Sequence, residues 1–437
     1  MVRMVRMLRL VAVSGLLLTT LTASSVAASP EAAATVDVIV VLDQAPGLAT
    51  AAVNRADAAS VAADHALNAR FLYGSALVGF AASVPQARLA ALESDPRVAY
   101  VDLDRDHSIV EPPGSGGGSI TAAQTTPWGI TRTGADTNTN EGAGVQVYVI
   151  DTGIDSNHED LAGNLGVGRA FASCRGGKSI CRTSWDDDHG HGTHVAGTIG
   201  AIDNAVGVLG MASQVTLHAV KVCSKSGSCS GSAIIAGIDW IAGQVVANGY
   251  GGRAVANMSL GGAGSKTGTC TSSGFTGSDA EHQAICNTTN RGVVFAVAAG
   301  NEGDDAANHV PAAYDDTVIT VSATTSSDDW PYWSNWGDAS ASWTVNSSAP
   351  VAIAAPGVSI LSTWNNGGYN TISGTSMATP HVAGAIALYL NTSQQAAAYS
   401  AFENARAGLL SSDESTDNFS NTSGHPHTED FLDASGL

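Results

Sequence analysis

The sequence predicts an α/β fold with a mainly parallel central sheet. From Trp128 onward, short apolar runs alternate with segments of helical pattern, and this alternation is typical of parallel sheets covered by helices. The chain has 437 residues, of which 44% are hydrophobic and 49 are glycine, so it is long enough for a large core of small side chains. The expected strands are 145–150, 215–222, 254–258, 293–298 and 318–321, and the expected helices are 193–199, 232–241, 279–287 and 379–390.

A smaller α+β unit is predicted ahead of this domain. Its pattern is a strand at 38–42, an alanine-rich helix ending near Asn68, a strand at 76–82, a helix at 86–92 and a strand at 98–103. The stretch 111–119 then reads Glu-Pro-Pro-Gly-Ser-Gly-Gly-Gly-Ser. Prolines and glycines at this density oppose regular structure and leave the backbone open to proteases. We therefore expect a linker at 111–121 between the two folded parts.

The first residues have the layout of a secretory signal peptide at 1–28. Arg3, Arg6 and Arg9 precede an apolar run at 10–21, and small residues lead to Ala28. A membrane anchor is the alternative, but the run is much shorter than the roughly 20 residues that cross a bilayer. We expect export, cleavage near Ala28, and a secreted, extracellular product without a membrane partner.

Net charge and cysteine content narrow the class of protein further. A formal charge of −20 argues against nucleic acid as a partner, because phosphate binding relies on Lys and Arg. All 6 cysteines lie after position 122, and an even number in an exported chain indicates disulfides. Proximity does not fix their connectivity, but it favours Cys174 with Cys181, Cys223 with Cys229 and Cys270 with Cys286.

Three polar residues stand where a predicted strand ends or a helix begins. Asp151 ends the apolar run Val-Tyr-Val-Ile, His191 opens a helix of small residues, and Ser376 directly precedes a long apolar helix. Ligands of open α/β sheets bind at the carboxyl ends of the strands. A serine hydroxyl is a poor nucleophile at neutral pH, so it needs a base, and the base needs a partner that fixes its tautomer. One Asp, one His and one Ser meet this need.

The segments around these residues resemble the catalytic motifs of the subtilisin (subtilase) family, nearest its proteinase K branch. The order Asp, His, Ser along the chain is that of subtilisin. The matching motifs are Asp-Thr-Gly at 151–153, His-Gly-Thr-His at 191–194, Ser-Leu-Gly-Gly at 259–262, Ala-Ala-Gly-Asn-Glu-Gly at 298–303 and Gly-Thr-Ser-Met-Ala-Thr-Pro-His at 374–381. The resemblance covers nearly all of the chain after Ala122. It implies a subtilisin-like three-layer fold at 122–437, preceded by a ferredoxin-like inhibitory propeptide at 29–110.

The resemblance also implies a role for each motif residue. Carried over by position, it makes Ser376 the nucleophile, His191 the general base and then acid, and Asp151 the group that orients the imidazole. Asn301 and the backbone N–H of Ser376 are then expected to donate hydrogen bonds to the negative oxygen of the tetrahedral intermediate.

Substrate binding is implied by the same resemblance. One segment is expected to pair with an extended substrate as an edge strand, and another to line the pocket for the residue before the cut. Main-chain hydrogen bonds are the same for every residue, so we expect broad cleavage of proteins and peptides, with a preference for aromatic or aliphatic side chains. The residues are Ser259, Leu260 and Gly261 for the edge strand, and Ala298, Ala299 and Gly300 for the pocket.

Histidines and acidic residues could form metal sites, but simpler interpretations are preferred. His189, His191 and His194 could surround a metal, but no Glu stands where a zinc-protease helix needs its base. We expect His194 and His381 to be structural. The acidic groups 186–188, 304–305, 315–316 and 328–329 could hold calcium, but solvated loop carboxylates are the preferred interpretation. Ala352 stands where proteinase K relatives have a calcium-ligating Asp. No cofactor is expected for the chemistry, and structural calcium remains an open alternative.

The remaining expectations concern maturation and competing functions. The propeptide is expected to template folding and block the cleft, with maturation near Ala122. The catalytic domain is expected to end close to Leu437 without a further module and to be a monomer. An esterase using the same residues, or an inactive fold used for binding, are the alternatives to an active endopeptidase. The intact set of catalytic residues opposes the inactive fold.

Overall fold

The computed structural model describes residues 34–44, 50–109, 123–337 and 350–437. The predicted signal peptide at 1–28 and the predicted linker at 111–121 lie outside these residues. Within them, no helix combines the length and the apolar character that crossing a membrane requires.

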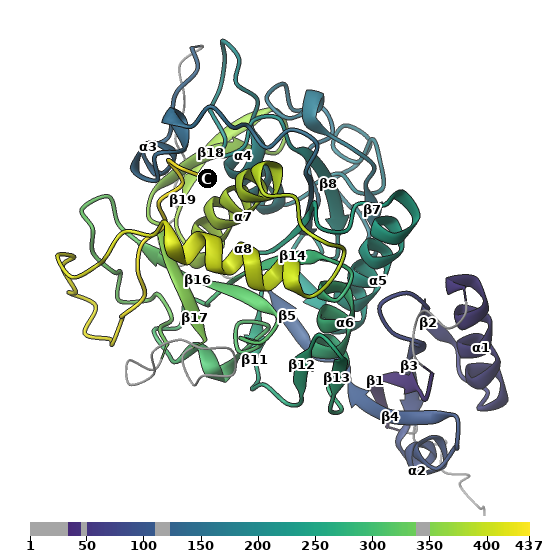
Figure 1. Cartoon of the computed structure of the whole chain (residues 1–437). Coiled ribbons are helices and arrows are strands. Elements are labelled where there is room, and N and C mark those ends of the chain that lie inside the picture. Colours follow the sequence, from purple (N-terminus) through teal and green to yellow (C-terminus); the bar gives the residue numbers. More distant parts are fainter. Residues whose placement is uncertain (1–33, 45–49, 110–122, 338–349) are drawn as a thin grey trace, which may run out of the picture. The chain divides into compact units, whose positions relative to one another are not determined.

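A seven-stranded parallel sheet forms the core of the larger domain (Figure 1). The strand order is β17-β16-β14-β10-β6-β8-β7. Five of these strands coincide with predicted runs, whereas β7 and β17 do not, because β7 is very short and β17 is rich in alanine and ends in proline. The strands are β6 (Gln146–Asp151), β7 (Arg169–Ala170), β8 (Thr216–Lys221), β10 (Ala254–Met258), β14 (Val293–Ala298), β16 (Val318–Thr324) and β17 (Val351–Pro356).

Helices cover both faces of the sheet. Alternate residues of a strand point to opposite faces, so each face carries its own set of apolar side chains. Val147 and Val149 of β6 belong to the apolar cluster formed with α4, α7 and α8, whereas Tyr148 and Ile150 belong to the cluster formed with α5 and α6. The predicted three-layer α/β fold is thereby confirmed. The main helices are α3 (Trp128–Arg132), α4 (His191–Gly200), α5 (Gly231–Asn248), α6 (Ala280–Thr289), α7 (Thr375–Thr392) and α8 (Ser400–Ser411).

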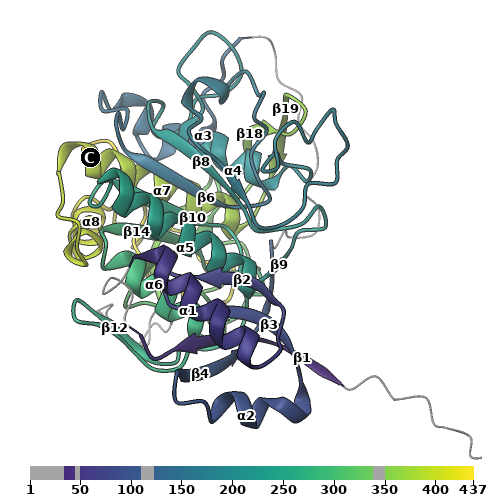
Figure 2. The same cartoon turned by 90° about the vertical axis from the view of Figure 1, so that its right-hand side faces the viewer.

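The α+β unit is a four-stranded antiparallel sheet with two helices (Figure 2). The order β2-β3-β1-β4 with the sequence βαββαβ is the connectivity of ferredoxin-like folds. Val40, Phe80 and Val61 belong to the core between this sheet and its helices. The elements are β1 (Thr35–Leu42), α1 (Ala51–Asp64), β2 (Ala69–Tyr73), β3 (Gly79–Pro85), α2 (Leu89–Glu93) and β4 (Val98–Leu103).

The predicted strand at 76–82 begins and ends 3 residues before β3 (Gly79–Pro85), and β2 is not predicted. The backbone N–H groups of Gly74, Ser75 and Ala76 all donate to Oδ1 of Asp239 in α5, at 3.0, 2.5 and 2.8 Å. These residues therefore form a turn around a carboxylate instead of extending the sheet, and β3 begins only at Gly79. The contact joins residues far apart in the sequence, so local periodicity cannot reveal it.

Short strands and a C-terminal segment complete the larger domain. The tail after α8 returns to the sheet, where Phe431 pairs with Ala354, and Leu432 and Ala434 join the main core. Its short strands are β9 (Ser228–Ser230), β11 (Gly262–Ala263), β12 (Thr269–Thr271), β13 (Gly274–Thr276), β15 (His309–Val310), β18 (Ile360–Trp364) and β19 (Gly368–Ile372). A further short strand, β5 (Asp106–Ser108), belongs to the segment that follows β4 and pairs with β9.

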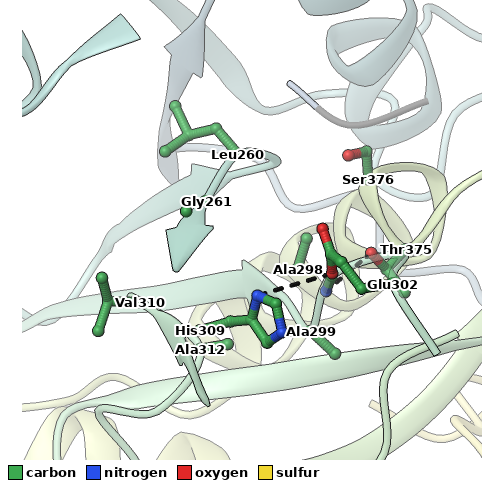
Figure 3. A pocket seen from close by; sticks show the side chains of 12 residues that line it. Leu260, Gly261, Ala298, Ala299, Glu302, His309, Val310, Ala312, Thr375 and Ser376 are labelled. Carbon is green, nitrogen blue, oxygen red and sulfur yellow. Dashed lines mark hydrogen bonds and ion pairs between the residues drawn. The ribbon is translucent and has the colours of Figure 1, made fainter. Parts of the chain in front are cut away.

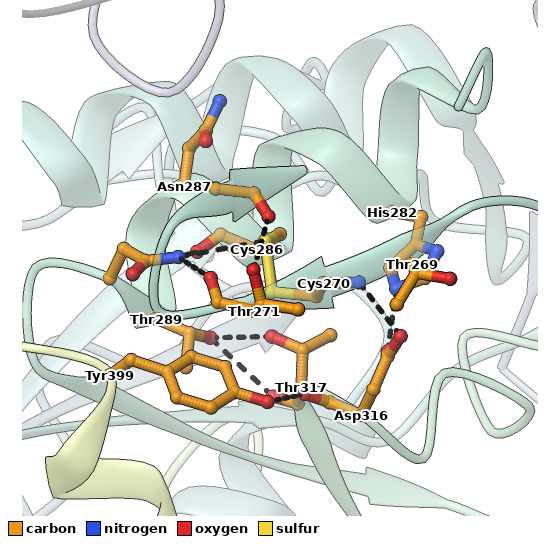
Figure 4. The surroundings of a disulfide bond; sticks show 12 residues. Thr269, Cys270, Thr271, His282, Cys286, Asn287, Thr289, Asp316, Thr317 and Tyr399 are labelled. Atoms are coloured by element: carbon orange, nitrogen blue, oxygen red, sulfur yellow. Dashed lines mark hydrogen bonds and ion pairs between the residues drawn. A yellow bond between two sulfur atoms is a disulfide. The ribbon is translucent and has the colours of Figure 1, made fainter. Parts of the chain in front are cut away.

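Three disulfides join the cysteines in the pairs that sequence proximity favours: Cys174 with Cys181, Cys223 with Cys229, and Cys270 with Cys286. The third is buried and links β12 to α6 (Figure 4). Next to it, Oδ2 of Asp316 accepts a hydrogen bond from the backbone N–H of Cys270 at 2.8 Å, and Oδ1 lies 2.7 Å from Nε2 of His282. The disulfide and this buried ion pair hold β12, α6 and the loop before β16 together.

Replacing both Cys270 and Cys286 by alanine is expected to lower the free energy of unfolding by about 3 kcal/mol, because the bridge closes a loop with a sequence separation of 16. The matched control replaces Cys174 and Cys181, which are only partly buried and 7 positions apart. Guanidinium denaturation of both variants is the measurement. An equal or larger loss of unfolding free energy in the control would show that the Cys270–Cys286 bridge is not the stronger of the two constraints.

Candidate active site

Asp151 and His191 meet where β6 ends and α4 begins. Asp151 is the last residue of β6 and His191 the first of α4. Nδ1 of His191 lies 2.9 Å from each carboxylate oxygen of Asp151, and both side chains are fully buried. Gly190, just before His191, has a φ of 124°, and a Cβ there would lie 2.2 Å from the ring of Trp364. The position therefore requires glycine.

Ser376 is the second residue of α7, which packs against α4. Its Oγ donates a hydrogen bond to the carbonyl of Ser259 at 3.2 Å, and Oγ of Ser259 donates to the carbonyl of Ser376 at 2.8 Å. Nδ2 of Asn257 in turn donates to Oγ of Ser259 at 2.9 Å. This buried network ties the start of α7 to the end of β10.

Asn301 is held by the residue that precedes Ser376. Its Oδ1 accepts hydrogen bonds from the backbone N–H of Thr375 at 2.8 Å and from the hydroxyl of Thr375 at 2.9 Å. The hydroxyl also accepts a hydrogen bond from the backbone N–H of Gly300 at 3.2 Å. These contacts assign the Oδ1 end of the amide to Thr375 and turn the donor end, Nδ2, to the other side.

A pocket lies beside Ser376 (Figure 3). Ser259 does not line it, since it is buried and acts through its hydrogen bonds with Ser376. The other predicted substrate-binding residues do line it, namely Leu260, Gly261, Ala298, Ala299 and Gly300. The structure thus brings together the two motif segments that the sequence singles out.

Glu302 and His309 also line the pocket, and sequence reasoning missed both. Oε2 of Glu302 lies 3.7 Å from Nδ1 of His309 and accepts a hydrogen bond from Asn335 at 2.8 Å. Glu302 follows Asn301 within the matched motif, so the motif could have pointed to it. His309 carries no local signal, because it reaches the pocket through the pairing of β15 with β11.

The segment of residues 106–109 lies between two strands beside this pocket. β5 pairs antiparallel with β9, and Ser108 exchanges backbone hydrogen bonds of 3.0 and 3.1 Å with Gly261. The N–H of Ile109 donates to the carbonyl of Gly227 at 3.0 Å. Since Gly261 is expected to pair with extended substrates, this segment has the pairing expected of one.

The carboxylates at 186–188 correct an expectation from the sequence. They are not solvated, since each is at most 3% exposed. Oδ1 of Asp187 accepts hydrogen bonds from the N–H groups of His189 and Gly190 and from the hydroxyl of Thr152, each at 2.9 Å. Asp315 and Asp316 are buried too, and Lys266 lies against Asp315 while His282 lies against Asp316. The solvated interpretation is therefore wrong for both groups.

Asp188 forms an ion pair with a fully buried lysine. Nζ of Lys221, at the end of β8, lies 2.6 Å from Oδ1 of Asp188 and donates to the carbonyl of Thr152 at 2.5 Å. Thr152 follows Asp151, so the ion pair supports the backbone next to the Asp151–His191 contact.

His194 and His381 are structural, as the sequence analysis expects. Nε2 of His194 lies 3.0 Å from the carbonyl of Ile360, and Nδ1 of His381 lies 2.9 Å from the carbonyl of Met377. Burial lowers the pKa of His194 to about 3 and that of His381 to about 4. Both side chains are therefore neutral at physiological pH.

One group of potential metal ligands occurs among the residues that the structure describes. It consists of Cys174, Cys181 and Asp188. The two cysteines form a disulfide and cannot supply thiolates, so this group does not have the chemistry of a metal site.

The sequence model of the "Subtilase family" matches residues 142–425. The chain belongs to the subtilase family. The resemblance predicted from the sequence is confirmed, and membership makes this subtilase a subtilisin-like serine peptidase and hence a hydrolase that acts on proteins.

Individual relatives agree with this membership. The subtilase is 41% identical over 323 residues to an extracellular serine proteinase of Thermus sp. (strain Rt41A), covering 73% of this chain and 68% of that protein. It is 40% identical over 327 residues to an alkaline serine protease of Corniculantispora psalliotae, covering 73% of each. The crystal structure of a cold-adapted subtilisin-like serine proteinase is similar with a TM-score of 0.54 and 37% identity, covering 70% of this chain and 97% of that one.

Replacing Lys221 by methionine is expected to lower the free energy of unfolding by about 3 to 5 kcal/mol, because Asp188 would remain as a buried charge without its cation. Lys225→Met is the matched control, since Lys225 is exposed and its replacement should change stability little. Chemical denaturation measures both. Similar stability of the two variants would show that the buried ion pair does not support this region.

Proposed function

We propose that this chain is a secreted serine endopeptidase with broad specificity, made as a zymogen and acting through Asp151, His191 and Ser376. The observation that carries the proposal is the buried contact between Asp151 and His191, whose helix α4 packs against α7, the helix that has Ser376 as its second residue. Ser376 also lies at a pocket formed by both predicted substrate-binding segments.

The proposed reaction divides one difficult step into two. Asp151 accepts a hydrogen bond from the Nδ1–H group of His191 and so fixes the tautomer in which Nε2 is the base for the Ser376 hydroxyl. In the structure this hydroxyl donates a hydrogen bond to the carbonyl of Ser259. A substrate N–H that takes this carbonyl would release the hydroxyl toward His191. The serine oxygen then attacks the carbonyl carbon, and the proton on His191 passes to the leaving amine. Water hydrolyses the acyl-enzyme in the second step.

The tetrahedral intermediate needs donors for its negative oxygen. Asn301 is suited to this role, because the hydrogen bonds that Thr375 donates to its Oδ1 fix the orientation of the side-chain amide. The N–H of Ser376 is in the first turn of α7, where backbone N–H groups have no acceptor within the helix. Together they make an oxyanion site that is fixed before the substrate arrives.

Broad specificity follows from how the substrate would be held. Pairing with Gly227 and Gly261 uses main-chain groups, which every sequence offers. Alanine and glycine residues along the pocket leave room for aromatic or aliphatic groups of the substrate. Glu302 and His309 add a polar side to an otherwise apolar lining.

The α+β unit is proposed to be the inhibitory propeptide. Its segment 106–109 occupies the strand position of a substrate, between β9 and Gly261. Its carboxylates also cap two helices of the larger domain: Asp104 accepts a hydrogen bond from the N–H of Ser232 at 2.7 Å, and Asp102 accepts one from the N–H of Ala280 at 3.0 Å. These contacts support both inhibition and templated folding.

Export and a monomeric state complete the proposal. The leader at 1–28 supports secretion, and the Thermus relative is named an extracellular proteinase. The proposed maturation site near Ala122 lies outside the described residues. Sedimentation of the mature protein tests the monomer, and sequencing of its first residues tests the maturation site.

Casein hydrolysis by the purified mature protein is the decisive assay. Wild type is expected to cleave casein, and phenylmethylsulfonyl fluoride is expected to abolish the activity. The Ser376→Ala precursor should remain a single uncleaved chain, because it cannot process itself. Asn301→Ala should mature slowly and lose roughly 10²–10³ in kcat, the effect that removing this donor has in subtilisin.

The same assay separates the alternatives. Hydrolysis of a small ester without cleavage of casein would favour an esterase. A matured wild-type protein that attacks neither would favour a binding module. Full casein activity in Ser376→Ala would refute the assignment of the nucleophile.

We also propose that the disulfides supply part of the stability that calcium gives relatives. The acidic groups at 186–188 and 315–316 already accept hydrogen bonds or pair with cations of the chain, and Ala352 removes one candidate ligand. Treatment with EDTA is therefore expected to leave the Tm of the mature protein unchanged. A large fall in Tm that added calcium reverses would contradict this proposal.

A further inference from the structure

A buried carboxylate lies beside the cleft and has no part in the reaction described above. Glu281 is in the first turn of α6, with its side chain 4% exposed. Its Oε2 lies 3.1 Å from Nε2 of His107, whose side chain is 1% exposed. The contact has the distance of an ion pair but not the alignment of a hydrogen bond, and Oε1 of Glu281 lacks a hydrogen-bond partner among the described residues. A carboxylate buried in this way is unfavourable unless a cation faces it.

His107 belongs to the segment that occupies the cleft like a substrate. Because Ser108 pairs antiparallel with Gly261, His107 lies opposite Gly262. The distances agree, since a Cβ on Gly262 would lie 3.6 Å from Cα and Cδ2 of His107. The Glu281 carboxylate therefore faces the side chain of whichever peptide residue lies opposite Gly262.

The register places this peptide residue relative to the reacting bond. The carbonyl of Ser259 accepts the hydrogen bond from Ser376, and Ser259 and Gly262 are 3 positions apart in the chain. In an antiparallel pairing, the peptide residue opposite Gly262 comes the same number of positions before the one opposite Ser259. If the residue opposite Ser259 carries the scissile carbonyl, the residue facing Glu281 is the fourth before the cut, called P4.

Release of the propeptide would remove the cationic side chains that lie near Glu281. Among the described residues, the cations near it are His107 and Arg105, and both belong to the propeptide. The neighbours from the larger domain are Asp279 and Tyr314, which are not cations, while His282 is engaged by Asp316. The mature cleft would thus present an uncompensated carboxylate at this position.

We propose that Glu281 forms an acidic P4 subsite, which selects substrates with a cationic side chain four residues before the scissile bond. The inference rests on the proposed function of Ser376. The favoured side chains are Lys, Arg and protonated His, and His107 of the propeptide is the first occupant. An apolar P4 side chain would cover the carboxylate without pairing it, whereas a cation restores the contact seen with His107.

The titration of the occupant agrees with this geometry. Burial disfavours the charged imidazole of His107, but the charge of Glu281 and their contact outweigh burial, so the pKa of His107 is raised above its ordinary value. A side chain whose pKa is raised on binding binds more tightly when protonated. Its advantage is complete below the pKa of the free imidazole, about 6.5, and is lost as the pH rises through the raised pKa.

Peptides that differ only at P4 test the subsite. We would measure kcat/KM of the mature protein on quenched fluorescent peptides with Lys, His or norleucine at P4, because norleucine matches much of the length of Lys without its charge. Wild type is expected to prefer Lys over norleucine by about 10-fold or more. In Glu281→Gln this ratio should fall to about one, whereas the exposed Glu403→Gln should keep the wild-type ratio.

Charge reversal separates recognition from a structural role. The Glu281→Lys variant should prefer Glu over norleucine at P4. Its precursor would also carry His107→Leu, so that like charges do not oppose maturation. For the wild-type protein, the ratio of kcat/KM for the His peptide to that for the norleucine peptide should be above one at about pH 6 and fall to about one at alkaline pH. The corresponding ratio for the Lys peptide should persist at alkaline pH. A wild-type ratio of one, or a Lys preference that survives in Glu281→Gln, would overturn the proposal.

Failure of the proposed function would be visible separately. If mature wild type cleaves none of the peptides, the peptidase assignment is wrong, and the subsite is tested by binding. The Lys peptide should then bind with a Kd about 10-fold or more below that of the norleucine peptide. Equal Kd values would overturn the acidic subsite.

Discussion

The carboxylate of Asp187 is the constraint on which the geometry of the site depends. Its oxygens accept hydrogen bonds from Thr152, which follows Asp151, and from His189, Gly190 and Thr193 at the start of α4. One buried side chain thereby fixes the end of β6 against the amino terminus of α4. The separation of Asp151 and His191 follows from this junction, and the helix terminus and its donors offset the cost of burying the charge.

Ser376 is positioned by a second junction of the same kind. The start of α7 is fastened to β10 by reciprocal hydrogen bonds with Ser259, and to the loop after β14 by the contact between Thr375 and Asn301. The proposed nucleophile and the proposed oxyanion donor thus share one support, which is the start of α7. Side chains held by buried hydrogen bonds at strand ends give a more exact site than mobile loops would.

The α+β unit meets the larger domain through an apolar cluster that includes Ile39, Val41 and Tyr73, and through carboxylates that accept hydrogen bonds from backbone N–H groups. Asp102 and Asp104 cap α6 and α5, and Asp239 of α5 in return holds the turn at 74–76. These contacts fix the amino-terminal turns of α5 and α6 against the α+β unit, as the proposed role of a folding template requires. The extended segment after β4 then passes through the cleft, where Glu281 adds a contact that depends on the charge of its partner.

Local patterns in the sequence predict the order of the catalytic motifs and the parallel α/β architecture, and the spacing of the cysteines favours the pairing that the structure shows. These are local properties, because strand and helix periods, short motifs and short loops are written in neighbouring residues. Tertiary structure alone decided the start of β3, the burial of Asp186–Asp188 and of Asp315–Asp316, and the presence of His309 and Glu281 beside the cleft. Each depends on a contact between residues far apart in the chain, such as Asp239 with the turn before β3, and only the folded chain brings these partners together.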